Sequence, residues 1–310
     1  MSADGGMRAV VAALLANFGI AVSKFVGFLV TGSTAMLAEA VHSVADTGNQ
    51  ALLLFGKRQA GRPADPAHPF GYGRNRYFYG FVVALVLFSL GSLFAIYEGV
   101  RKISHPHGLD SPAVAIGILG VAIVLEALSF RTAVHESNRV RAGNGWVAFI
   151  RRSKAPELPV VLLEDFAALV GLVFAMGGVV AATVTGDARW DGAGSIAIGA
   201  LLGVVATVLA VEMKSLLIGE SAEPATVADI AAALVDGTTI TRIIHLRTMH
   251  LGPEELLVAA KVALAPGLSM AQVAAAIDDA EVRVRARVPI ARPMYLEPDL
   301  YRDLAGESTS

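Results

Sequence analysis

The sequence predicts an α-helical membrane protein with six transmembrane helices and a small C-terminal α+β (αββαβ) cytoplasmic domain. The 310-residue chain is 55% hydrophobic and 17% charged, and its mean hydropathy is +0.59. That balance is far more apolar than a soluble protein tolerates. The apolar character ends near residue 220, so we expect a transmembrane domain over residues 1–220 and a soluble domain over residues 221–310.

Six segments are long and apolar enough to cross a membrane, which takes about 20 helical residues. They cover residues 7–30, 35–55, 78–100, 113–133, 159–183 and 196–217. The loops after the second and fourth segments hold eleven basic residues, against three in the other loops. The positive-inside rule therefore puts both termini in the cytoplasm. Because residues 1–7 do not resemble a signal or transit peptide, we expect a prokaryotic plasma (inner) membrane.

The soluble part alternates between helical and strand patterns. Thr226–Asp236 has helical spacing, with Thr226 as the expected N-cap. Residues 241–250 and 255–265 alternate around a Gly-Pro turn and predict a hairpin. A second helix is expected over Ser269–Val288, with Ser269 as its N-cap, and a last strand over Pro293–Glu297. This αββαβ order predicts a two-layer domain with both helices on one face of the sheet.

The second apolar segment carries a stripe of polar residues. Its members lie at i, i+3, i+7, i+10 and i+11 and share one helix face: Glu39, His42, Asp46, Asn49 and Gln50. Ionisable side chains at membrane depth usually face the protein interior and mark an ion or proton pathway. His42 and Asp46 can point at one ion. The chain has no cysteine, so a transition-metal site must use His, Asp, Glu, Asn or backbone ligands.

Other polar residues are expected to support this stripe. Glu39 lies one turn toward the membrane surface, where we expect it to pair with Lys24 or line the entrance, with direct metal ligation as the weaker alternative. Asn17 and Asn49 are expected to make hydrogen bonds between helices. Glu126 is expected near a helix end, in a snorkelling or loop-pairing role.

Several motifs along the chain resemble one family. They are Ala16-Asn17 with Lys24, Thr31-Gly32-Ser33, the run from Leu37 to Asp46, the run from His68 to Arg74, and the C-terminal αββαβ unit. Together they resemble the cation diffusion facilitator family of divalent-metal/proton antiporters. The resemblance implies a homodimer through a ferredoxin-like cytoplasmic domain, and export of Zn²⁺, or of Cd²⁺, Mn²⁺, Co²⁺ or Fe²⁺, in exchange for protons. It implies neither an enzyme nor a permanent cofactor.

The family pairs the HxxxD motif of the second helix with another on the fifth, where this chain differs. Alignment by one set of landmarks puts Glu164 at the His position, whereas another set puts Asp165 at the Asp position. We prefer Glu164 and keep Asp165 as the alternative. The Glu-Asp pair resembles the mitochondrial-type zinc transporter subfamily. The expected transport site is His42, Asp46 and Glu164, with Asp165 or water as fourth ligand, because zinc favours four such ligands.

Two secondary metal sites follow from the resemblance alone. Asp65 and His68 match the family's interfacial site, but Tyr72 stands where some members carry His, so we expect this site to be weak or absent. His245 and Glu297 fall on family ligand positions in the soluble domain. Their neighbours do not supply the family's other ligands, so we expect dimerisation without a full binuclear zinc cluster.

The segment Arg139–Lys154 interleaves basic residues with Trp146 and Phe149. It is typical of a basic amphipathic segment on an anionic lipid surface, and equally of a topology-setting loop. We do not expect a nucleic-acid role, because the segment flanks a spanning helix. Two other functions stay open: a metal sensor or scaffold that does not transport, and a membrane metalloenzyme. The chain lacks HExxH and has no carboxylate base beside two His ligands, so the enzyme is disfavoured.

Overall fold

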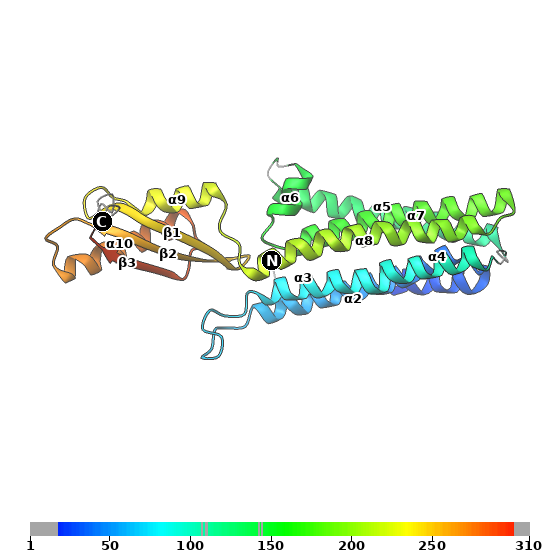
Figure 1. The fold of residues 1–310 in the computed structure, drawn as a ribbon, viewed down its shortest axis with the longest axis horizontal. Coiled ribbons are helices and arrows are strands. Elements are labelled where there is room, and N and C mark those ends of the chain that lie inside the picture. Colours follow the sequence, from blue (N-terminus) through cyan, green and yellow to red (C-terminus); the bar gives the residue numbers. More distant parts are fainter. Residues whose placement is uncertain (1–17, 107, 109–110, 142, 144, 301–310) are drawn as a thin grey trace, which may run out of the picture. The chain divides into compact units, whose positions relative to one another are not determined.

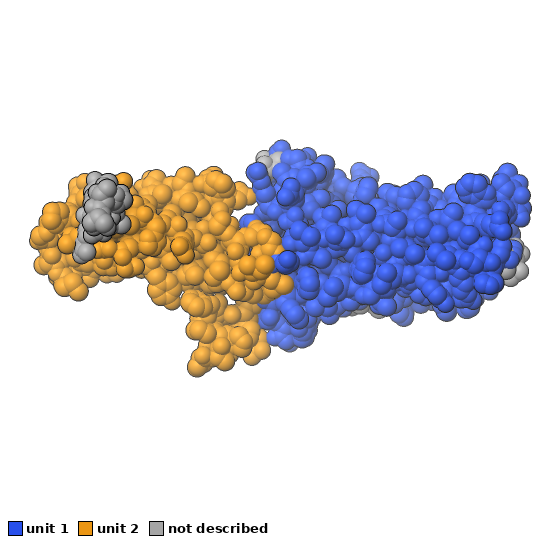
Figure 2. All heavy atoms as spheres, viewed as in Figure 1, with its two compact units in different colours: residues 1–59, 75–214 blue, residues 60–74, 215–310 orange. Residues whose placement is uncertain are grey.

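The computed structural model describes residues 18–300 except 107, 109–110, 142 and 144. The chain divides into two compact units, drawn in blue and orange in Figure 2. Unit 1 comprises the chain up to Gln59 together with Asn75–Lys214, and unit 2 comprises Ala60–Arg74 together with the chain from Ser215 onward. Unit 2 therefore includes the loop that leads from α2 to α3.

Unit 1 is a bundle of long helices that lie lengthwise beside one another (Figure 1). After the helical segment Phe18–Thr31 come α2 Thr34–Ala60, α3 Asn75–Val86, η1 Leu87–Leu93, α4 Phe94–Ser104, α5 Pro112–Val140, α6 Trp146–Arg152, α7 Glu157–Thr185 and α8 Arg189–Ile218. The η1 segment is π-helical and continues α3 into α4 as one rod. Its wider turn inside an otherwise α-helical span is an irregularity that is often found near functional sites.

Four of the described helices are long and apolar enough to cross a membrane by length and composition. They span Asn75–Ser104, Pro112–Val140, Glu157–Thr185 and Arg189–Ile218. The α2 helix has 27 residues but carries the polar stripe, and the expected first span begins outside the described residues. The chain is thus an integral membrane protein, while the count of six spans stays a prediction.

Two close contacts hold the bundle together at the end where α2 and α8 begin. Asp191 of α8 is fully buried and accepts hydrogen bonds from the Ser33 hydroxyl at 2.6 Å and the Thr34 backbone N–H at 2.9 Å. A carboxylate here satisfies N–H groups that a helix start leaves unpaired and complements its dipole. Gly99 of α4 faces Gly192 of α8 so tightly that a Cβ on Gly99 would lie 2.6 Å from the Gly192 carbonyl oxygen. Small residues permit such close approach of membrane helices.

Unit 2 contains the αββαβ order that the sequence predicts. Its elements are α9 Pro224–Leu234, β1 Ile240–Gly252, β2 Glu255–Leu264, α10 Met270–Arg287 and β3 Met294–Asp299. The described strands form one sheet of order β1-β2-β3, antiparallel between β1 and β2 and parallel between β2 and β3. Apolar residues of α9, α10 and the sheet share one core, including Ile230, Val258 and Val284.

The two predicted helix caps of unit 2 have different outcomes. Ser269 is the N-cap of α10 and forms a capping box with Gln272, which confirms that prediction. Thr226 is wrong as the N-cap of α9, because the helix begins two residues earlier, at Pro224, with Glu223 as its N-cap. Proline is favoured in the first turn, since its missing N–H would have no helical partner there.

The loop 60–74 packs on the β1–β2 hairpin within unit 2. A Cβ on Gly73 would lie 2.8 Å from the Leu251 carbonyl oxygen, so only glycine permits this approach. The Arg74 guanidinium lies 3.2 Å from the sulfur of Met249, and the rings of Phe70 and Tyr295 meet edge to face with centroids 6.5 Å apart. The loop is therefore held by contacts at several points along its length.

Candidate functional site

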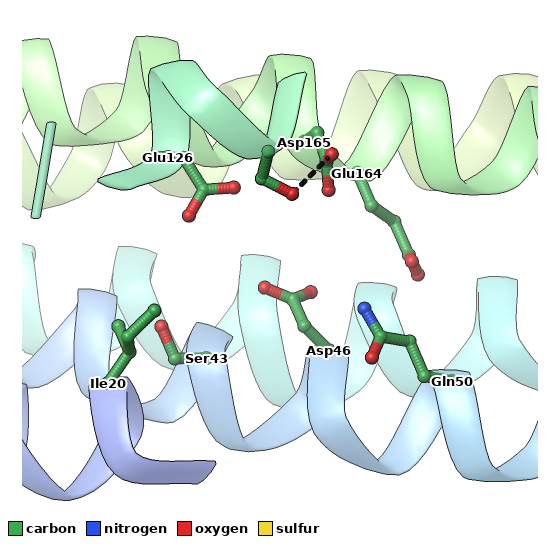
Figure 3. Close-up of a pocket in the computed structure, with 8 residues that line it drawn as sticks. Ile20, Ser43, Asp46, Gln50, Glu126, Glu164 and Asp165 are labelled. Carbon is green, nitrogen blue, oxygen red and sulfur yellow. Dashed lines mark hydrogen bonds between the residues drawn. The ribbon is translucent and has the colours of Figure 1, made fainter. Parts of the chain in front are cut away.

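A pocket inside unit 1 is lined by carboxylates from three helices (Figure 3). The acidic residues that line it are Asp46 of α2, Glu126 of α5, and Glu164 and Asp165 of α7. Ile20, Ser43, Gln50 and Ser129 complete the lining. Acidic side chains at this depth are costly in a bilayer and persist where they line an ion pathway or pair with one another.

The two adjacent acids of α7 are tied to different helices. The Asn49 side chain of α2 donates a hydrogen bond of 2.8 Å to Oε1 of Glu164, and both residues are buried. The Ser129 hydroxyl of α5 donates a bond of 2.9 Å to Oδ2 of Asp165, drawn dashed in Figure 3. The interhelical hydrogen bond predicted for Asn49 is thus confirmed. Both bonds come from neutral donors, which orient the carboxylates without neutralising them.

His42 lies beside the pocket but is not part of its lining. Its side chain is fully buried, and Nδ1 lies 3.4 Å from Oδ1 of Asp46. Among the described residues, neither ring nitrogen of His42 has a hydrogen-bond partner. A buried polar atom without a partner is costly and asks for an explanation, such as a ligand that it binds in another state.

The structure brings the predicted transport residues near one another without assembling a metal site. Asp46, Glu164 and Asp165 share the pocket, whereas His42 contacts Asp46 from outside its lining. Within the part of the chain that the structure describes, no three His, Asp or Glu side chains converge closely enough to hold a metal ion. Side chains of α2 and α7 must therefore reorient before one ion can contact all of them.

Glu39 is paired with Lys24, as the sequence predicts. The Lys24 ammonium lies 3.1 Å from Oε2 of Glu39 and donates to the Ser43 hydroxyl at 2.8 Å. Glu39 also presses against α7, where a Cβ on Gly171 would lie 2.6 Å from Oε1 of Glu39. Glu39 is engaged in this ion pair and is not part of the pocket lining. Asn17, for which a supporting role is predicted, lies outside the described residues.

Glu126 is the acidic pocket residue that the sequence analysis did not place at the site. The expectation that it lies near a helix end is wrong, because α5 extends from Pro112 to Val140 and places Glu126 at its middle. The expected span ended at residue 133, since the polar residues that follow lower its hydropathy. The sequence feature that could have identified Glu126 as a pocket residue is its position as an acidic residue inside an apolar run.

Comparison with known proteins places the chain in a family. Residues 10–218 match the family model described as the cation efflux transmembrane domain. This chain belongs to the cation efflux family. That family is the cation diffusion facilitators, so the resemblance seen in the motifs is confirmed.

Individual relatives refine this assignment to the cation efflux family. The chain is 31% identical over 264 residues to "Proton-coupled zinc antiporter SLC30A9, mitochondrial" of Xenopus laevis, an alignment covering 84% of this chain and 47% of that protein. It is 32% identical over 251 residues to metal tolerance protein C4 of Arabidopsis thaliana, covering 79% and 54%. Magnetosome protein MamB of Magnetospira sp. (strain QH-2) is 27% identical over 247 residues, covering 78% of each chain. The similarity to SLC30A9 agrees with the mitochondrial-type subfamily, although this chain spans about half the length of the first two relatives.

In the loop of this cation efflux protein, Tyr72 contacts Asp65, a residue of the predicted secondary site. The Tyr72 hydroxyl donates a bond of 2.6 Å to Oδ2 of Asp65, and His68 Nδ1 lies 3.5 Å from Oδ1 of Asp65. The bonds from Tyr72 and from the His68 backbone N–H hold the pKa of Asp65 below its ordinary value, and the same carboxylate raises the pKa of Tyr72. Tyr72 thus engages one carboxylate oxygen of Asp65, and a weak or absent metal site here stays a prediction.

The predicted ligand positions in unit 2 are separated by a lysine. Sheet register places His245 beside Lys261 and Lys261 beside Glu297. The Lys261 ammonium lies 2.9 Å from Asp299 and 3.0 Å from Glu297, and these two carboxylates raise the pKa of Lys261. A fixed positive charge between the two candidate ligands opposes cation binding there.

Proposed function

We propose that this protein exports a divalent metal cation, Zn²⁺ foremost, from the cytoplasm in exchange for protons. The observation that carries the proposal is the pocket between α2, α5 and α7, where four carboxylates gather inside helices of a membrane bundle. Family membership and the relatives named as proton-coupled zinc antiporters support the same reaction. Mn²⁺ is a further substrate to test, because carboxylate-rich sites also accept harder ions than zinc. Cd²⁺, Co²⁺ and Fe²⁺ are tested beside it.

His42, Asp46 and Glu164 are the proposed ligands, with Asp165 or water in the fourth position. Imidazole and carboxylate bind a metal only after losing their protons, so metal binding releases protons and protons displace the metal. The imidazole nitrogens of His42 have no hydrogen bond to break first, at least to any described residue. Glu164 can use Oε2 while Asn49 keeps its bond to Oε1.

The wider arrangement is part of the proposal. Six spans, both termini in the cytoplasm and a prokaryotic plasma membrane follow from the hydropathy and loop-charge pattern of the sequence. Residues 221–310 are proposed as a ferredoxin-like domain through which two copies form a homodimer. The αββαβ elements of unit 2 support that reading.

Zinc flux in proteoliposomes under an imposed pH gradient tests the function. Wild type should accumulate zinc and dissipate the proton gradient, whereas Asp46→Asn should lose at least nine-tenths of that flux. Glu136→Gln is the matched control, because Glu136 lies on α5 with an exposed side chain and pairs with Arg139 outside the pocket. Wild-type flux in the Asp46 variant would overturn the proposed site.

Zinc binding measured on the same preparations separates the remaining alternatives. Glu164→Gln should lower zinc affinity more than Asp165→Asn if Glu164 is the ligand, and the reverse order would exchange their roles. Tight zinc binding by wild type with no flux under any gradient would replace the transporter by a metal sensor or scaffold.

A further inference from the structure

We propose that the groove between α5, α6 and α7 binds an anionic phospholipid of the surrounding bilayer. One acyl chain would lie in the groove, and the phosphate headgroup would contact Arg151 and Arg152. Neither the family assignment nor the proposed transport reaction gives these residues a role. Binding of the lipid is independent of the proposed function.

The groove is apolar on all sides that the structure describes. Its walls are Phe130 and Val134 of α5, Trp146 and Ile150 of α6, and residues of α7 that include Phe166. Beneath it, the buried Phe149 of α6 packs against α5 and α7. An apolar groove on a helix surface that faces hydrocarbon is suited to an acyl chain, since burial of that chain costs no polar contact.

The charge of α6 supplies the second half of the site. Arg151 and Arg152 form its last turn, and Arg151 is 72% exposed. Arg151 Nε lies 3.7 Å from Glu212, and the guanidinium carries further N–H donors that suit a phosphate. The Arg141 guanidinium stacks 4.5 Å above the Trp146 ring, which adds a third positive charge at the rim of the groove.

These two features together select the occupant. A helix with an apolar face in contact with the bundle and arginines on its exposed end is typical of the boundary between headgroups and acyl chains. A neutral lipid would fill the groove without using the arginines, and a soluble anion would use the arginines without filling the groove. An anionic phospholipid satisfies both.

Bound lipid would also adjoin the transport pocket. Phe130 follows Ser129 in α5, and Phe166 follows Asp165 in α7, so groove and pocket use neighbouring positions of the same two helices. The ring centroids of Phe130 and Phe166, which both line the groove, lie 6.1 Å apart. Any effect of the lipid on flux rests on the proposed function, whereas its binding can be measured separately.

Quenching of Trp146 fluorescence by brominated acyl chains tests the binding. The chain has two tryptophans, Trp146 and Trp190, so Trp190→Phe leaves one reporter in the groove wall. The protein is reconstituted in phosphatidylcholine vesicles that contain increasing fractions of brominated phosphatidylglycerol or, separately, brominated phosphatidylcholine. Each arginine near an anionic headgroup should strengthen binding about fivefold. Half-maximal quenching should therefore be reached at a fraction of brominated phosphatidylglycerol at least about tenfold lower than the fraction of brominated phosphatidylcholine.

Two variants and one matched control, all in the Trp190→Phe background, locate the effect. Arg151→Gln with Arg152→Gln should bring the two lipids to similar half-maximal fractions. The matched control is Lys57→Gln with Arg58→Gln, which removes two exposed basic residues from the last turn of α2 and should leave the preference unchanged. Val134→Phe narrows the groove and should reduce quenching by both lipids.

Three results would overturn the proposal. They are equal quenching by both lipids in the parent protein, loss of preference in the α2 control as large as in the α6 variant, and absence of quenching by either lipid. A normal thermal unfolding curve for each variant ensures that a changed signal reports the groove.

Discussion

Replacing Lys24 by methionine should destabilise unit 1 more than replacing both members of its ion pair. The Lys24 and Glu39 side chains are 1% and 0% exposed, and their charged atoms lie 3.1 Å apart. Methionine keeps the length of the lysine side chain but leaves the Glu39 carboxylate buried without its counter-ion. Oε1 of Glu39 already lacks a hydrogen-bond partner among the described residues.

The expected magnitude follows from the burial of both partners. Breaking a buried ion pair by removing one member costs about 3–5 kcal/mol, whereas replacing both members by uncharged groups is often close to neutral. Lys24→Met and Glu39→Gln should therefore each cost about 3–5 kcal/mol. The double variant should cost less than either, which corresponds to a favourable coupling of at least about 3 kcal/mol between the two residues.

Reversible chemical unfolding in detergent, followed by circular dichroism, measures these differences. Lys57→Met is the matched control, since Lys57 is an exposed lysine of α2 and its loss should change stability by less than about 0.5 kcal/mol. Additive costs in the double variant would refute the reasoning, because they would mean that Lys24 and Glu39 stabilise the bundle independently. Zinc flux of the double variant then shows whether the pair also acts in transport.

Three further predictions concern other contacts. Asp191→Ala should cost about 3–5 kcal/mol in the same unfolding assay, because it leaves the start of α2 uncapped and removes the carboxylate that lies 3.8 Å from the buried Lys102 ammonium. Gly99→Ala should lower the thermal midpoint by several degrees, whereas Gly120→Ala, with no atom within 4 Å of the added Cβ, should not lower it. Tyr72→Phe should move the pKa of Asp65 up toward its ordinary value, so that in a carbon-13 carboxyl titration the Asp65 charge is lost at higher pH than in wild type.

Hydropathy and helical periodicity were enough to predict the long helices and the αββαβ order, because both patterns reflect burial along a single element. The stripe on α2 was likewise visible, and so was the pairing of Glu39 with Lys24. The position of Glu126 was not predicted, because the polar residues after position 133 led to an expected helix end there, whereas α5 continues to Val140. The absence of His42 from the pocket lining could not be predicted from the sequence either. The direction of a side chain on a helix face depends on the neighbouring helices.

The ambiguity between Glu164 and Asp165 has a structural basis. Successive residues of a helix point about 100° apart, so adjacent acids on α7 face different neighbours. Glu164 faces α2 through Asn49, on the helix that carries Asp46, whereas Asp165 faces α5 through Ser129. Asp46 and Glu164 therefore lie on two helices that are joined by a direct hydrogen bond, whereas Asp165 is hydrogen-bonded to a third helix. This arrangement supports the proposal of Glu164 as the partner of Asp46, while Asp165 and Glu126 line the same pocket.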